Sequence, residues 1–164
     1  MTLPAPDVNE DFVDMVASLA DHGAEFLVVG AHALAAHGFP RATGHIDLLV
    51  RPPPRNAARV YRAIAAFGAP VAAHGVTEED LQREGQVNQI GLPPRRIDIL
   101  NLLSGVSFDE ATAESVGGRI GTVPVRFIGK DALARNKRAP GRLKDLADAE
   151  LLEQPATEDG DSEP

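Results

Sequence analysis

The sequence contains no cysteine, which excludes disulfide bonds, thiolate zinc sites and a cysteine nucleophile. It has no tryptophan and one tyrosine, so it lacks the aromatic platforms on which single-stranded bases stack. No apolar run approaches the length of a transmembrane helix, and residues 1–7 have neither the basic start nor the apolar centre of a signal peptide. We therefore expect a cytoplasmic protein without a membrane partner.

Charge is unevenly distributed along the chain, which has 16 basic and 24 acidic residues and a formal net charge of −8. Residues 153–164 are acidic and contain no base, whereas residues 126–144 are strongly basic. An acidic protein with one basic segment fits a single phosphorylated ligand better than a long nucleic acid. The basic segment is also typical of a solvated helix face, and this alternative stays open.

The length of 164 residues suits one domain with a sizeable core. We expect this domain to span residues 1–152. The acidic tail, residues 153–164, has too few apolar groups to offset the entropy of ordering it. Cutting the chain after Leu152 should therefore leave the melting temperature almost unchanged.

The apolar periodicity predicts helices interleaved with strands. Helices are expected over residues 7–22 with Asp7 as the N-cap, 31–37, 56–67, 77–80, 108–111, 130–138 and 143–152. Strands are expected over residues 25–30, 46–51, 70–74, 86–92, 96–100 and, at a sheet edge because of Pro124, 119–128. Residues 86–100 should form a hairpin. The mixture predicts an α/β or α+β fold, with a mixed β-sheet flanked by helices.

Residues 41–51 combine the apolar pattern of a buried strand with charged and titratable side chains. Asp47 interrupts an apolar run, and a carboxylate there is costly unless it is paired, hydrogen-bonded or bound to a metal. Because side chains alternate along a strand, His45 and Asp47 should project from the same face. Asp98 interrupts the strand at 96–100 in the same way, and one sheet could bring Asp47 and Asp98 side by side. Two such carboxylates repel each other unless a cation lies between them, which indicates a divalent metal site.

Gly30 and Ala31 follow the first predicted strand, where the chain turns into a helix. Exposed amide N–H groups at such a junction attract phosphate, and glycine lets a ligand approach the backbone closely. The sequence therefore predicts a phosphate-cradling turn near the acidic strand.

Two motifs together resemble the nucleotidyltransferase superfamily. The first is FLVVGAHALAAHGFPRATGHIDL at residues 26–48, and the second is NKRAPGRLKDLAD at residues 136–148. The branch they resemble comprises small bacterial proteins with a minimal nucleotidyltransferase domain, some of them linked to toxin–antitoxin and phage-defence systems. The resemblance extends over residues 10–152.

The resemblance implies a polymerase-β-like palm that transfers a nucleoside monophosphate from a nucleoside triphosphate to an acceptor such as a protein, a tRNA or a small molecule. It implies that a divalent metal, magnesium or manganese, is held by His45, Asp47 and Asp98, with the two aspartates as the catalytic acids. It also implies a set of nucleotide-binding residues: Gly30, Ala31, Arg41, Thr43, Lys137 and Lys144.

The chain departs from the family pattern at two positions. Ala31 stands where the family often has serine or glycine, and His45 stands where it has the first metal-binding acid. Magnesium prefers oxygen ligands, whereas imidazole suits manganese, zinc and other transition metals. A second hypothesis therefore stays open: a catalytically inactive domain that binds a nucleotide or a protein partner, such as an antitoxin-like component with its toxin.

Simpler roles are open for each candidate. The two acids could cap a neighbouring loop or pair with Arg95 or Arg96. His45 could bond a backbone group, and the lysines could solvate a helix face. His32 and His37 lie five residues apart, which is not the spacing of a helical metal pair, so we expect them to be structural or exposed.

Overall fold

A computed structural model describes residues 9–68 and 76–154. Within these ranges the chain forms seven helices and six strands, in the order α1 (Glu10–Asp21), β1 (Phe26–Val29), α2 (Gly30–Ala36), β2 (His45–Val50), α3 (Arg55–Phe67), α4 (Glu78–Gln82), β3 (Val87–Ile90), β4 (Arg96–Leu100), α5 (Phe108–Ala113), β5 (Val116–Ile120), β6 (Val123–Phe127), α6 (Lys130–Arg138) and α7 (Leu143–Glu153). The mixed α/β class predicted from the sequence is confirmed.

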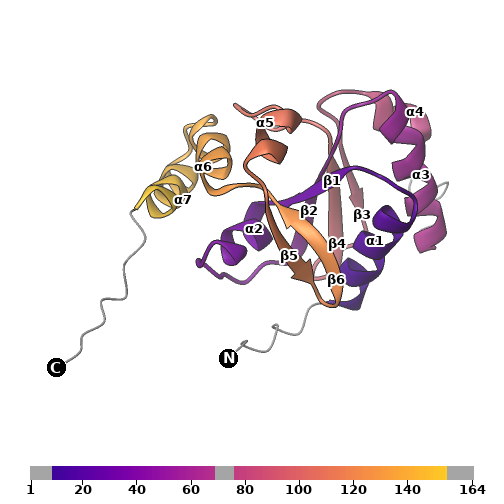
Figure 1. Cartoon of the computed structure of the whole chain (residues 1–164), viewed down its shortest axis with the longest axis horizontal. Coiled ribbons are helices and arrows are strands. Elements are labelled where there is room, and N and C mark those ends of the chain that lie inside the picture. The colour runs from indigo at the N-terminus through magenta and orange to yellow at the C-terminus, as the bar shows by residue number, and fades with distance from the viewer. Residues whose placement is uncertain (1–8, 69–75, 155–164) are drawn as a thin grey trace.

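The six strands form one mixed sheet in the order β3-β4-β2-β1-β6-β5 (Figure 1). Strand β2 runs parallel to β4, and β1 runs parallel to β6. The other neighbours are antiparallel, including β3 and β4, which form the predicted hairpin. The two strands that carry acids, β2 and β4, therefore lie side by side inside the sheet.

Helices flank the sheet on both sides. Helices α1 and α3 pack against each other on one side, while α2, α6 and α7 lie on the other (Figure 1). The largest fully buried side chains come from both layers: Met15, Leu19, Leu27, Leu34, Ile46, Leu48, Leu49, Ile64, Ile97, Ile99, Ile128 and Leu133. This core anchors β2 and β4, so the polar residues between their buried neighbours have fixed positions.

Capping residues explain several helix boundaries. Asn9 is the N-cap of α1 and its side chain accepts a hydrogen bond from the Asp11 amide. The predicted cap, Asp7, and the predicted strand at 70–74 lie outside the described residues. Helix α4 begins with a capping box, in which the Thr77 side chain accepts from the Asp80 amide and the Asp80 side chain accepts from the Thr77 amide.

The segment around Pro124 differs from the prediction of one edge strand. The chain instead forms a hairpin here. Strands β5 and β6 pair antiparallel, Pro124 lies in β6, and Gly121 lies at the turn in a left-handed conformation (φ 58°). Strand β5 is the edge, and β6 lies between β5 and β1. Pro124 is tolerated inside the sheet because β6 pairs with β1 through Phe127, at the opposite end of the strand.

The C-terminal helix passes the predicted domain boundary by one residue. Glu153 ends α7 and accepts hydrogen bonds from the Arg138 guanidinium. Both side chains are exposed, so the pair contributes little to stability. Residues 155–164 are not described, and the expectation for the tail stays a prediction.

Across the described ranges, none of the helices combines the length and the apolar character that crossing a bilayer requires.

Candidate functional site

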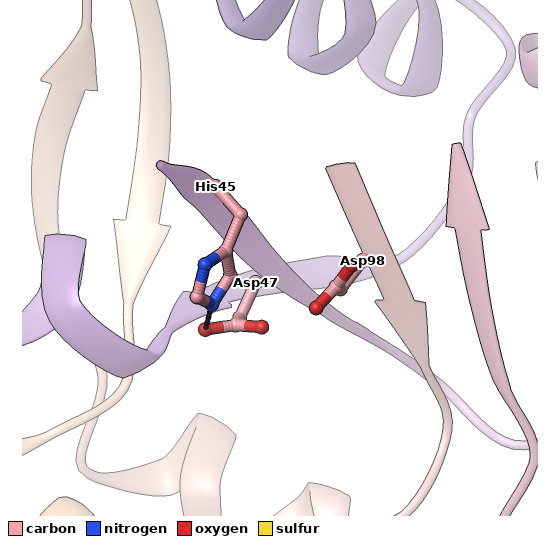
Figure 2. Close-up of side chains that lie close together, drawn as sticks. All are labelled: His45, Asp47 and Asp98. Carbon is pink, nitrogen blue, oxygen red and sulfur yellow. Dashed lines mark ion pairs between the residues drawn. The ribbon is translucent and has the colours of Figure 1, made fainter. Parts of the chain in front are cut away.

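The site is created by the register of two parallel strands. His45 on β2 is aligned with Arg96 on β4, and Asp47 is aligned with Asp98. Since alternate side chains share a face, these four side chains gather on one face of the sheet. The sequence-based predictions that His45 and Asp47 share a face and that Asp47 and Asp98 lie side by side are both confirmed (Figure 2).

Three potential metal ligands converge in this cluster. The His45 Nε2 atom lies 3.2 Å from Asp47 Oδ2, and ligand atoms of His45, Asp47 and Asp98 all lie within 4.8 Å of one another. The set comprises one imidazole nitrogen and two carboxylates. Such mixed donors suit manganese, zinc and similar metals better than magnesium, which prefers oxygen. The residues present therefore fit a divalent transition metal.

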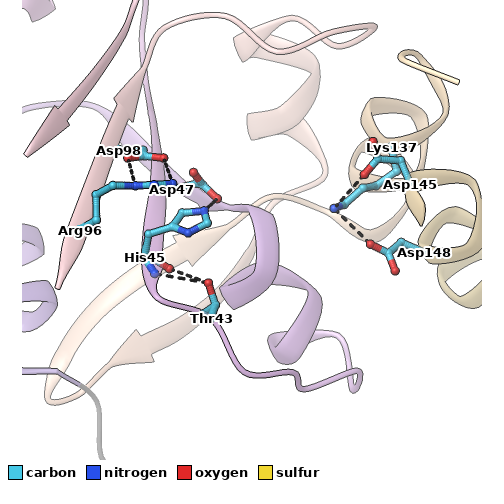
Figure 3. Close-up of polar contacts among 8 residues, drawn as sticks. All are labelled: Thr43, His45, Asp47, Arg96, Asp98, Lys137, Asp145 and Asp148. Carbon is cyan, nitrogen blue, oxygen red and sulfur yellow. Dashed lines mark hydrogen bonds and ion pairs between the residues drawn. The ribbon is translucent and has the colours of Figure 1, made fainter. Parts of the chain in front are cut away.

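Arg96 is already bound to one of these ligands. Its Nε donates to Asp98 Oδ1 at 3.0 Å and its Nη2 donates to Asp98 Oδ2 at 3.1 Å (Figure 3). This two-pronged contact is the strongest geometry for an arginine–carboxylate pair. One of the simpler roles considered for Asp98, pairing with an arginine, thus exists alongside the potential metal site. Arg95 instead pairs with Asp11 at 3.2 Å.

Burial and neighbouring charges act together on Asp47. Burial is the main cause that raises the pKa of Asp47 above its ordinary value, and the charge of Asp98 raises it further. The charges of His45 and Arg96 oppose this shift. A divalent cation at the cluster would favour the ionised carboxylate and stabilise its charge.

The turn between β1 and α2 approaches the Asp47 carboxylate closely. Val29 is aligned with Asp47, and Gly30 follows with a φ of 67°, in the left-handed region. A Cβ atom on Gly30 would overlap Asp47 Oδ2 and lie 3.1 Å from Asp47 Cγ. Glycine is required here both for the backbone angle and for the space that the carboxylate occupies.

A cavity of about 380 Å³ opens beside Asp47 and Gly30. Asn136, Lys137, Arg142 and Asp145 from the α6–α7 region contribute polar groups to its lining. Val87, Leu100, Leu102 and Leu103 contribute aliphatic groups to the same lining. A phosphorylated ligand with an apolar portion could be held there, since basic and aliphatic groups border the same space.

Lys137 is held in the cavity wall by two acids from α7. Its Nζ atom lies 3.3 Å from Asp148 Oδ2 and 3.7 Å from Asp145 Oδ1 (Figure 3). Asp148 is buried, with 3% of its surface exposed, and its other oxygen lies 2.8 Å from Arg41 Nη2. Sequence reasoning missed Asp148. The signal was its spacing of three from Asp145, which places both acids on one face of a helix.

The predicted nucleotide-binding residues divide into two groups. Gly30 and Lys137 line the cavity next to Asp47, whereas Ala31, Arg41 and Thr43 line a separate cavity of about 680 Å³. Thr43 Oγ1 donates to the His45 carbonyl at 3.1 Å, so it supports the start of β2. Arg41 is turned toward Asp148 because that buried carboxylate requires a charged partner.

Other polar candidates lie away from the cluster. Lys144 is exposed and does not line the cavity beside Asp47. His37 Nε2 lies 2.8 Å from the Ile128 carbonyl, which is a structural contact, and the His32 ring packs edge-on against Phe12. A third cavity, of about 510 Å³ and lined by Arg51 among others, contains none of the predicted site residues.

No protein-family model matches the chain, and comparison with curated proteins finds no match.

The Arg96 contact changes what is expected of Asp98. Relief of repulsion from Asp47 alone would make Asp98→Asn neutral or stabilising. Because Arg96 already neutralises this nearly buried carboxylate, we expect Asp98→Asn to lower the free energy of unfolding by about 1–2 kcal/mol. Urea denaturation would measure the change.

Asp109→Asn is the matched control for this variant. Asp109 accepts a hydrogen bond from Arg51 at 2.9 Å, but its side chain is 83% exposed. Its loss should cost less than about 0.5 kcal/mol. Equal effects of the two variants, or a stabilised Asp98→Asn, would show that the Arg96–Asp98 pair does not contribute to folding.

Proposed function

We propose that this chain is a nucleotidyltransferase-like protein with a polymerase-β-like palm. It transfers a nucleoside monophosphate from a nucleoside triphosphate to an acceptor with the help of a divalent cation. The observation that carries the proposal is the alignment of Asp47 with Asp98 on adjacent parallel strands, with His45 3.2 Å from Asp47. The glycine turn and Lys137 border the same cavity, which is consistent with phosphate binding.

The reaction is a substitution at the α-phosphorus. An acceptor oxygen forms a bond to this phosphorus, the bond to the bridging oxygen of the β-phosphate breaks, and pyrophosphate leaves with the negative charge. Such a reaction needs positioning and charge stabilisation more than covalent chemistry from the protein. A divalent cation supplies charge neutralisation when bound, and His45, Asp47 and Asp98 would hold it.

The protein's own residues have distinct roles in this proposal. Ionised Asp47 provides a carboxylate, and the missing side chain of Gly30 leaves the space that this carboxylate occupies. Lys137, at the cavity wall, balances charge on the phosphates, and Asp98 can accept the proton of the attacking hydroxyl once Arg96 no longer occupies it. The aliphatic wall, which includes Val87 and Leu102, provides an apolar surface for the nucleoside.

The acceptor is proposed as a class. A protein or a tRNA hydroxyl fits the reaction, since either supplies the attacking oxygen. The resemblance further suggests a bacterial cytoplasmic setting and a toxin–antitoxin partner.

A binding-only domain is the second candidate. Two features favour it: His45 stands where the family that the sequence resembles has an acid, and Arg96 already occupies Asp98. Such a domain, antitoxin-like or not, would bind a nucleotide or a protein without turnover.

A label-transfer assay tests the proposal. Each of the four nucleoside triphosphates, labelled at the α-phosphate, would be incubated with the chain, cell-extract acceptors and either Mn²⁺ or Mg²⁺. We expect label transfer with Mn²⁺ that Asp47→Asn reduces at least about 100-fold, whereas Asp109→Asn stays at the natural rate. Absence of transfer together with metal-dependent nucleotide binding would favour the second candidate.

A further inference from the structure

Arg96 belongs to the same cluster as the proposed metal ligands. It is aligned with His45 across the β2–β4 pair and lies two residues before Asp98 on β4, so its side chain shares their face. Its guanidinium contacts both oxygens of Asp98, at 3.0 and 3.1 Å (Figure 3). A cation therefore already sits at one end of the cluster in the chain itself.

The charge balance of the cluster follows from this contact. Asp47 and Asp98 supply two negative charges when ionised, and Arg96 supplies one fixed positive charge. The Asp98 side chain is 8% exposed and the Arg96 side chain 25%, so solvent screens their attraction only weakly. Both oxygens of Asp98 already accept hydrogen bonds from Arg96, so a divalent metal would have to compete for them. The metal would also be repelled by the positive charge of the guanidinium.

Among the described residues, no arginine or lysine forms an ion pair with Asp47 at the opposite end of the cluster. His45 Nε2 and Asp47 Oδ2 face each other at 3.2 Å, and Asp47 borders the cavity that Lys137 also lines. The donor that faces Asp47 Oδ2 in this contact is an imidazole, which can itself ligate a metal when neutral.

We propose that Arg96 is a built-in cation that competes with divalent metal for Asp98, so that the cluster takes one metal ion, at His45 and Asp47. Arg96 thereby supplies one fixed positive charge at the Asp98 end of the cluster. Full ligation by Asp98 requires that the guanidinium be displaced. The inference rests on the proposed function only for the presence of a metal, and metal binding alone tests it.

Titration of the full chain with Mn²⁺, followed by the electron paramagnetic resonance signal of free Mn²⁺, gives stoichiometry and affinity without a nucleotide. We expect one ion per natural chain. In Arg96→Gln we expect affinity at least about tenfold tighter, because a positive charge next to the ligands is removed. Arg95→Gln is the matched control: it removes the same charge one residue away, from a side chain that pairs with Asp11 outside the cluster, and it should bind as the natural chain does.

Arg96→Lys is a second variant that keeps the inference testable if Arg96→Gln does not fold. It keeps the charge but removes the two-pronged geometry, so its affinity should fall between those of the natural chain and Arg96→Gln. Mn²⁺ should also raise the melting temperature of Arg96→Gln more than that of the natural chain, since the metal replaces the missing cation.

Two tightly bound ions in the natural chain, unchanged or weaker affinity in Arg96→Gln, or no Mn²⁺ binding by any variant would each overturn the inference. If Arg96→Gln does not fold, natural affinity in Arg96→Lys would overturn it. The Mn²⁺ titration contains no nucleotide, so its result does not depend on whether the chain transfers nucleotides. Conversely, metal-dependent nucleotidyl transfer together with unchanged Mn²⁺ affinity in Arg96→Gln would contradict this inference and support the proposed function.

Discussion

Replacing His45 with aspartate is expected to raise Mg²⁺-dependent nucleotidyl transfer at least about tenfold, since ligand changes in a metal site commonly alter affinity or activity by 10- to 100-fold. A carboxylate at position 45 would project from the same face as Asp47 and add both an oxygen ligand and a negative charge. Comparison of transfer rates with Mg²⁺ and Mn²⁺ measures the change. The ratio of the two rates should shift toward Mg²⁺.

The same variant should be less stable without metal. A third carboxylate near Asp47 and Asp98 adds repulsion, which the single charge of Arg96 offsets only in part. The melting temperature should therefore fall in a chelator and recover with Mg²⁺. His45→Asn, which adds no charge, should show neither effect, and His45→Asp combined with Asp47→Asn should lose the gain in transfer. Robust Mg²⁺-dependent transfer by the natural chain, unchanged in His45→Asp, would show instead that histidine is a competent member of the site.

Gly30→Ala should lower the free energy of unfolding by about 3 kcal/mol or more. Two costs add in this variant. The backbone of Gly30 has a φ of 67°, which alanine adopts at a cost of about 1 kcal/mol, and the new methyl group would overlap Asp47 Oδ2. Because the carboxylate must move to make room, Mn²⁺ affinity should fall as well. Denaturant titration and the Mn²⁺ assay measure the two effects.

Gly23→Ala separates these costs. Gly23 has the same φ of 67°, but a Cβ atom there meets nothing within 4 Å, so this variant should lose only about 1 kcal/mol. Asp47→Ala should recover part of the stability lost by Gly30→Ala, since it removes the overlapping group. Similar losses in Gly23→Ala and Gly30→Ala, or no recovery in the double variant, would show that the turn is not fitted to the Asp47 carboxylate.

The acidic cluster was predictable because it follows from two local rules. Alternation along β2 places His45 and Asp47 on one face, and an acid between buried residues in each of two strands points to a shared site. The pairing of Asp47 with Asp98 still required the parallel neighbours β2 and β4, which a strand list alone does not determine.

The partner of Asp98 could not be predicted from the sequence alone. Alternation also places these two side chains on one face of β4, so their pairing was visible as an alternative. Whether Asp98 turns to the arginine or to a metal depends on side-chain geometry and on the charges across the neighbouring strand. That balance is a property of the folded sheet, not of the local sequence.

The site at α7 and the second hairpin were harder to predict for different reasons. Asp148 lies on a helix and meets Arg41 from a loop about a hundred residues earlier, a contact that no local pattern encodes. The strand β5 contains Gly117 and Gly118, which have low β-propensity, and its pairing with β6 outweighs that preference.

Mn²⁺-dependent binding of nucleoside triphosphates tests the central claim most directly, because it needs no acceptor. Equilibrium binding of each of the four triphosphates would be measured for the natural chain, Asp47→Asn and Asp109→Asn. We expect the natural chain and Asp109→Asn to bind at least one triphosphate only when Mn²⁺ is present, and Asp47→Asn to bind it at least about tenfold more weakly. Binding that survives both a chelator and Asp47→Asn, or no binding of any triphosphate by the folded natural chain, would contradict a metal-dependent nucleotide site at His45, Asp47 and Asp98.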